Sequence, residues 1–176
     1  HKGTSFPVGK AAFMDLYPLN FQEFLCALGE ERFAELLQSG DTQMINTFAS
    51  KYKDRLREYY YVGGMPEVVQ SYVNDKDFGR VREIQKDLLN YYRQDFSKHA
   101  ENSLVPRLNR VWDSIPMQLA KENKKYIYGQ VREGARAKDF ELAIQWLLDC
   151  GLIHKVNRVS KPALPLKAYL NLDAFK

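Results

Sequence analysis

Apolar residues that recur every three or four positions dominate residues 19–100, and this spacing constrains the fold more than any other feature of the sequence. The clearest case lies in residues 74–103, where one apolar stripe is formed by Val81, Ile84, Leu88, Tyr91, Tyr92 and Phe96. A repeat of about 3.6 residues places such side chains on one face of an α-helix. The chain is therefore predicted to be mainly helical.

Capping residues divide this region into several helices. Asn20 followed by Glu23 has the spacing of a capping box, and Gly29 is placed to end the helix that Asn20 begins. After a second short helix, one long helix is expected to run from Asp41 to about Tyr61. Ahead of these helices, residues 11–17 are expected to form a short strand.

Residues 104–176 follow a different pattern. They predict a helix over 104–112, a second short helix that begins at Pro116, a strand over 126–131, a helix within 137–151 that Gly151 ends, and a hairpin of two strands within 152–172. Helix, helix, short strand, helix and hairpin is the order of a winged helix-turn-helix. We therefore predict a helical bundle followed by a winged helix-turn-helix with a small β-wing.

The stretch "YYYVGGMPEVVQSYV" joins two of the predicted helices. Gly63 or Gly64 can adopt the left-handed conformation that ends a helix, and Pro66 suits the first turn of the next one. A corner between helices accounts for every one of these residues. The alternative is a ligand contact, in which a flat group approaches the backbone of the glycines. Because the negative charge of Glu67 already occupies the helix N-terminus, that group is expected to be a base or ribose rather than a phosphate.

The absence of several motifs limits the chemistry of the chain. It contains no phosphate-binding loop of the G-x-x-x-x-G-K-[ST] type, so it is not expected to hold a triphosphate by itself. Its three histidines are far apart in the sequence, with no cysteine or carboxylate at ligand spacing, which argues against a zinc site. No catalytic or metal-binding residue is predicted.

Charge is unevenly distributed along the chain. The net charge is +4, but residues 101–176 carry 13 basic and 8 acidic side chains, whereas residues 1–100 carry 13 and 14. A polyanion would therefore meet the C-terminal part. The last predicted helix has a mainly acidic exposed side, with exposed positions expected at Lys138, Asp139, Glu141, Gln145 and Asp149. A nucleic-acid contact is therefore expected instead from the hairpin, through Lys155, Arg158, Lys161 and Lys167.

The apolar runs are much shorter than the ~20 residues that a membrane span needs, so no membrane contact is expected. Cys26 and Cys150 fall within helical patterns, where cysteine usually behaves as a small buried apolar residue. We expect both thiols to be reduced and the protein to be cytoplasmic.

Four blocks, beginning "SFPVGKAAFMDLYPL", "YYYVGGMPEVV", "RVREIQKDLLNYY" and "GARAKDFELAIQWLL", together resemble a prokaryotic family of AAA-type P-loop ATPases with an uncharacterised C-terminal domain. The resemblance implies that residues 1–18 end an ATPase core, residues 19–100 form a helical lid, and residues 101–176 form a winged-helix module that is cut short. Both ends of the chain look truncated, so the partners expected first are the protein's own missing core and C-terminal domain.

The resemblance also implies a ligand and a role. Gly64, Met65 and Pro66 are similar to a Gly-x-Pro that packs beside adenine in the lids of related ATPases, so they are expected to line the base side of a site for ATP and Mg²⁺ in the full-length protein. This chain alone is expected to be inactive, and to couple ATP turnover in the core to a protein partner or to DNA. The alternative is a DNA-binding winged-helix regulator whose helical half dimerises.

Overall fold

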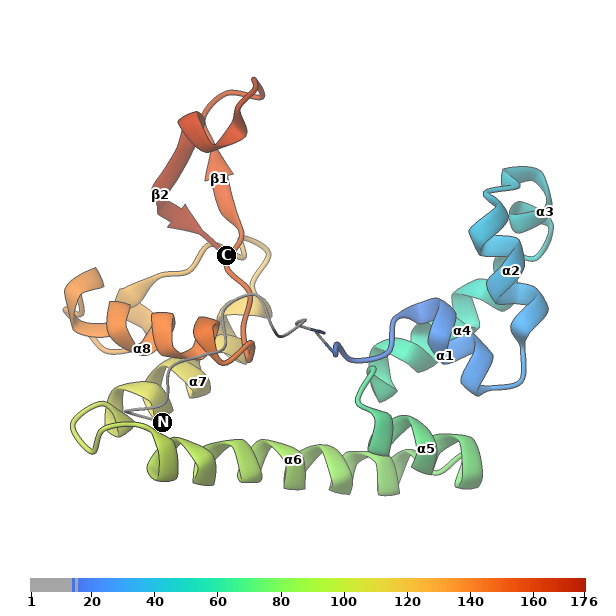
Figure 1. Cartoon of the computed structure of the whole chain (residues 1–176), viewed down its shortest axis with the longest axis horizontal. Coiled ribbons are helices and arrows are strands. Elements are labelled where there is room, and N and C mark those ends of the chain that lie inside the picture. Colours follow the sequence, from blue (N-terminus) through green and yellow to red (C-terminus); the bar gives the residue numbers. More distant parts are fainter. Residues whose placement is uncertain (1–13, 15) are drawn as a thin grey trace, which may run out of the picture. The chain divides into compact units, whose positions relative to one another are not determined.

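The structure, a computed structural model, describes residue 14 and residues 16–176 (Figure 1). These residues form eight α-helices, two short 3-10 helices and one two-stranded antiparallel sheet, so the chain is mainly helical, as predicted. It divides into two compact units after Leu89. Most of the strand predicted over residues 11–17 falls outside the described residues, and residues 14, 16 and 17 belong to no helix or strand.

Every secondary-structure element in the described part of the first unit is a helix. Its elements are α1 (Phe21–Ala27), α2 (Glu31–Ser39), α3 (Thr42–Thr47), α4 (Ala49–Val62), α5 (Pro66–Asp75) and the first part of α6 (Phe78–His99). The capping box that begins α1 is confirmed. The Asn20 side chain accepts a hydrogen bond from the Glu23 N–H (3.0 Å), and the Glu23 carboxylate accepts one from the Asn20 N–H (2.7 Å).

The single helix predicted from Asp41 to Tyr61 is wrong, because the chain breaks at Phe48 into α3 and α4. The Thr47 hydroxyl donates to the Gln43 carbonyl (3.0 Å), a side-chain bond of the kind that competes with the regular helical ladder. Phe48 at the break and Tyr52 on α4 pack on Phe33, whose ring meets theirs edge-on at 5.5 and 5.4 Å between centroids.

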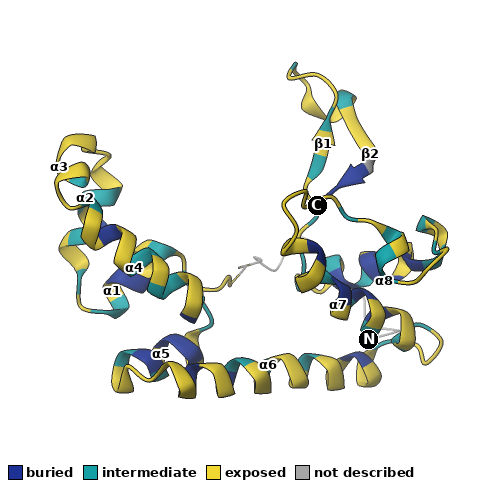
Figure 2. Ribbon diagram, turned by 180° about the vertical axis from the view of Figure 1, so that it is seen from behind, coloured by how far each residue is buried: buried dark blue, intermediate teal, exposed yellow. Residues whose placement is uncertain are grey.

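Apolar residues of α1, α4, α5 and α6 form the larger core of the first unit, seen as dark blue segments in Figure 2. Its buried members are Phe24, Val62, Val68, Val69, Tyr72, Val81 and Ile84. A smaller cluster of Leu25, Ala34 and Tyr52 joins α1 to α2 and α4. The apolar faces predicted from periodicity are thus the faces that are buried.

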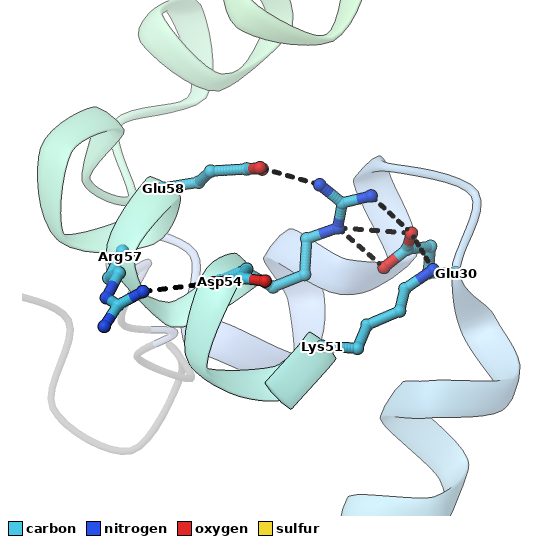
Figure 3. A network of polar contacts seen from close by, with 6 residues as sticks. Glu30, Lys51, Asp54, Arg57 and Glu58 are labelled. Atoms are coloured by element: carbon cyan, nitrogen blue, oxygen red, sulfur yellow. Dashed lines mark hydrogen bonds and ion pairs between the residues drawn. The ribbon is translucent and has the colours of Figure 1, made fainter. Parts of the chain in front are cut away.

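A charged network supports the turn between α1 and α2 (Figure 3). Glu30 is only 15% exposed and binds Arg55 (2.8 Å) and Lys51 (2.9 Å), both on α4. Arg55 also binds Glu58 (2.7 Å), one turn further along the same helix. These contacts hold the pKa of Glu30 below its usual value, chiefly through the hydrogen bond from Arg55.

The second unit contains the rest of α6 followed by α7 (Val105–Leu119), α8 (Ala137–Asp149), β1 (Asn157–Val159) and β2 (Leu170–Phe175), with 3-10 turns at Tyr128–Gln130 and Leu166–Tyr169. Its core lies between α7 and α8. The buried members are Phe96, Leu108, Val111, Phe140, Ala143, Ile144, Leu147 and Phe175. The predicted hairpin is present: β1 pairs antiparallel with β2, and Val159 lies opposite Leu170.

Two predicted elements of the second unit are wrong. Pro116 does not begin a new helix but lies inside α7. Proline has no N–H to donate to the carbonyl four residues earlier in the helix. Because Pro116 is exposed, water can bond to that carbonyl instead. The segment predicted as a strand over 126–131 forms only a 3-10 turn, although the Tyr126 N–H donates to the Phe175 carbonyl (2.8 Å) at the end of β2.

A close main-chain approach joins the segment before α1 to the corner between α4 and α5. The Leu19 N–H donates to the Gly64 carbonyl (2.7 Å), and the Tyr59 hydroxyl donates to the Leu19 carbonyl (2.7 Å). A Cβ atom at Gly64 would lie 2.2 Å from the Leu19 carbonyl oxygen, far inside any allowed contact. Glycine is therefore required at this position by the fold itself.

Gly64→Ala is expected to destabilise the first unit by at least about 2 kcal/mol, because Leu19 has to move away from the added methyl group. Gly40→Ala is the matched comparison: nothing lies within 4 Å of its Cβ position, and only its left-handed backbone (φ 70°, ψ 13°) is strained, so a loss of about 1 kcal/mol is expected. Both tryptophans, Trp112 and Trp146, lie in the second unit. Stability should therefore be measured by amide hydrogen exchange in residues 19–75, and equal losses in the two variants would contradict the close approach.

Glu30→Gln is expected to lower the stability of the first unit near neutral pH by about 1–2 kcal/mol, since a charge-assisted pair with Arg55 is lost. The wild-type contribution is present above the unfolded-state pKa of Glu30 and disappears as the pH falls through its lowered folded-state pKa. The difference between the two proteins should therefore shrink on acidification. Glu35→Gln, an exposed site on α2, is the control, and a pH-independent difference would contradict the ionic role of Glu30.

Candidate functional site

The corner between α4 and α5 is built from the residues singled out in the sequence. Gly63 ends α4 with a positive φ of 76°, and its N–H donates to the Tyr59 carbonyl (2.7 Å). Met65 is the N-cap of α5 and Pro66 occupies the first turn. The structure thus has the predicted helix corner, with proline where its missing N–H costs nothing. Gly63 ends α4 at a positive φ as expected, but its ψ of −168° is not that of the predicted left-handed conformation.

The surroundings of the corner restrict what it can contact. The Leu19 backbone fills the side of Gly64 on which a Cβ would lie, so a flat ligand has no access to Gly64 from that direction. Gly63 has no such neighbour. Pro66 and Glu67 are exposed, and Met65 is half-buried against the core. Any ligand at this corner would therefore meet Pro66 and the outer part of Met65 first.

Tyr72 lies beneath the corner on α5 and is buried. Burial, together with the neighbouring Glu58 carboxylate, raises the pKa of the Tyr72 hydroxyl to about 12. The phenol therefore keeps its proton at neutral pH and cannot serve as a base there.

The described residues contain no group of three or more histidine, cysteine, aspartate or glutamate side chains that could hold a metal ion. Among the helices in the described part of the chain, none has the length and apolar character to cross a membrane.

Both cysteines are free, but the expectation that they are buried is wrong, because Cys26 and Cys150 are exposed. Cys26 lies next to the buried Leu25 on the outer side of α1, and Cys150 is the residue that caps α8. Partial burial of the sulfur and the nearby Asp149 charge raise the pKa of the Cys150 thiol. Cys150 is therefore mainly a protonated thiol and a poor nucleophile at neutral pH.

The four basic residues proposed for a nucleic-acid contact do not form one group. Arg158, Lys161 and Lys167 are exposed on β1 and on the connection between the strands. Lys155 instead is half-buried, with its ammonium 4.2 Å from the centre of the Phe175 ring. Its charge is engaged in a cation–π contact. The Lys161 ammonium lies farther from a ring, 6.0 Å from the centre of Tyr169, and Lys161 is exposed, so three of the four cations are presented to solvent.

The outer face of α8 is not basic. Lys138, Glu141 and Asp149 are exposed, and the Gln145 side-chain amide donates to the Asp149 carboxylate (2.7 Å). Asp139, also expected to be exposed, is half-buried and caps the helix through the Arg136 N–H (2.8 Å). Leu142 is 68% exposed on this face. An acidic and partly apolar helix face suits a protein surface better than DNA phosphates.

Sequence reasoning missed a polar pocket between the start of α7 and the start of α8. It has a volume of about 230 Å³ and is lined by Arg107, Arg110 and Arg132 together with Ser103, Pro106, Asp139 and Phe140. The spacing of Arg107 and Arg110 was a usable signal, because residues three apart share a helix face. The contribution of Arg132, from the turn before α8, becomes visible only in the folded chain.

Comparison with known proteins identifies one family. Residues 53–176 match the model of a family described as "Domain of unknown function (DUF8612)". The match starts within α4 and continues through β2, so it contains the corner and the whole second unit. No curated protein and no solved structure matches the chain. Because the match covers more than half of the residues, the chain belongs to the DUF8612 family.

Proposed function

We propose that this chain is the lid and winged-helix portion of an AAA-type P-loop ATPase. ATP binding and hydrolysis take place in a core outside this chain and move the lid, and the winged helix passes that motion to a partner. The role of the chain is mechanical, and ATP is its ligand only together with that core.

The observation that carries this proposal is the contact between Leu19 and the corner. In the ATPases that the sequence resembles, the segment ahead of the lid leaves the core, and the Gly-x-Pro of the lid packs beside adenine. Here the Leu19 N–H donates to the Gly64 carbonyl, with 2.7 Å between nitrogen and oxygen, so the end of that segment and the Gly-x-Pro are held together. A nucleotide bound where core and lid join would lie next to the exposed Pro66.

The order of elements in the second unit supports the winged-helix part of the proposal. In this proposal, α7, the 3-10 turn at Tyr128–Gln130 and α8 correspond to the three helices of a winged helix, and β1 and β2 correspond to its wing. The Tyr126–Phe175 main-chain bond stands where a winged helix has its short first strand. Because the outer face of α8 is acidic and carries the exposed Leu142, we propose a protein partner for it.

The proposal predicts a phosphate-binding loop, encoded upstream of His1, in the full-length protein. In that protein, Pro66→Ala is expected to weaken ATP binding about fivefold to tenfold, because part of the apolar surface against the base is lost. Alanine suits the first turn of a helix, so α5 should remain intact. Binding is measured with a fluorescent ATP analogue.

Pro116→Ala is the control, since Pro116 is also an exposed proline within a helix but lies in the second unit. It should leave ATP affinity unchanged. A full-length sequence without a phosphate loop, or an unchanged affinity in Pro66→Ala, would contradict the proposal.

The three exposed cations of the hairpin favour a second candidate function, DNA binding by a winged-helix regulator. None of Arg158, Lys161 and Lys167 forms an ion pair with a carboxylate whose side chain the structure describes, a set that leaves out Asp173. This candidate predicts that the chain binds duplex DNA with an affinity that falls steeply with salt, and that Lys161→Glu weakens it.

Fluorescence anisotropy of a labelled duplex at several salt concentrations tests this second candidate. Lys121→Glu, an equal charge reversal at an exposed residue outside the hairpin, is the control. Equal affinities of the Lys161→Glu and Lys121→Glu proteins would argue against contact through the hairpin.

A further inference from the structure

The polar pocket at the start of α7 and α8 gathers three arginines from two places in the sequence. Arg107 and Arg110 lie on one face of α7, and Arg132 comes from the turn that precedes α8. Bringing three like charges into one pocket costs electrostatic energy unless negative charge is present. The arrangement therefore raises the question of what neutralises them.

The protein supplies only part of that negative charge. Of the described residues that line the pocket, Asp139 alone is acidic. Its carboxylate accepts the Arg136 N–H (2.8 Å) and lies 3.9 Å from the Arg132 guanidinium. Three guanidinium groups against one carboxylate leave an excess of two positive charges in the pocket.

Two of the three arginines of the pocket, Arg107 and Arg110, form no ion pair with any side chain that the structure describes. Both are exposed, so their guanidinium groups can reach a ligand from solvent. The Asp139 carboxylate is already engaged with Arg136 and Arg132, and it feels the Arg107 charge only through space.

The lining of the pocket suits an oxyanion rather than an apolar ligand. Guanidinium groups present paired N–H donors that match the oxygens of a phosphate group. The exposed Ser103 hydroxyl on the rim is a further possible donor. A phosphate dianion would balance the two excess positive charges.

We infer that Arg107, Arg110 and Arg132 form a binding site for a single phosphate group. The group belongs either to a free phosphate or phosphate monoester, or to the backbone of a nucleic acid. This site shares no residue with the corner at Gly64 to Pro66 or with the hairpin cations. The inference does not depend on the ATPase proposal.

The test follows backbone amide signals of the whole chain by two-dimensional ¹H–¹⁵N NMR during titration. The probes are inorganic phosphate and, separately, a short DNA duplex without terminal phosphates. Shifts are expected at Ser103, Arg107, Arg132 and their neighbours. A response to inorganic phosphate alone identifies a free phosphate or monoester as the ligand, whereas a response to the duplex identifies the nucleic-acid backbone.

Arg107→Gln is expected to weaken binding of the responding probe about tenfold, and the double variant with Arg110→Gln more strongly, because charge-assisted hydrogen bonds are lost. Arg82→Gln is the matched control: it removes one exposed arginine of α6 that has no carboxylate partner among the described residues, and it should bind like the wild type. The spread of amide chemical shifts in the same spectra shows whether each variant is folded.

If the double variant does not fold, Arg132→Gln provides the same comparison. The inference is overturned if neither probe shifts the pocket amides, or if the folded double variant, or Arg132→Gln in its place, binds as tightly as the wild type.

Discussion

The main-chain approach of Leu19 to Gly64 is the constraint on which the first unit depends. It joins the segment ahead of α1 to the corner between α4 and α5, and the Tyr59 hydroxyl closes the same contact from α4. Apolar packing alone does not specify how a short helix such as α1 enters a bundle. The contact sets that entry with two hydrogen bonds, and it leaves no room for a side chain at Gly64. The proposed function relies on the same contact, because it places the end of the leading segment beside Pro66.

Local chemistry made much of this fold predictable. The Asn20–Glu23 capping box, the glycine that ends α4 and the proline that begins α5 each act within a few residues, so the sequence pattern was enough to find them. The errors arose where apolar periodicity carries no signal. It does not mark the break at Phe48, next to which the Thr47 hydroxyl donates to the Gln43 carbonyl, and it does not show that Pro116 lies on the solvent side of a continuous α7.

The candidate sites show the same limit. The corner residues were identifiable from glycine and proline, but not the Leu19 backbone that covers Gly64, because that contact joins residues far apart in the chain. Among the hairpin cations, the separate role of Lys155 depends on the position of the Phe175 ring. The arginine pocket was missed because Arg132 lies beside Arg107 and Arg110 only after α7 and α8 pack together. Charge counted along the sequence indicated a basic C-terminal part, but not where those charges converge.

The boundary between the two compact units lies inside a helix. α6 runs from Phe78 to His99, whereas the units divide after Leu89. Val81, Ile84 and Leu88 of this helix belong to the core of the first unit, and Tyr92 and Phe96 to that of the second. Cutting the chain at the boundary would leave each unit with a helical segment close to the length below which isolated helices are marginal in water. A separately expressed form of either unit therefore has to retain all of α6, so the two pieces would overlap in sequence.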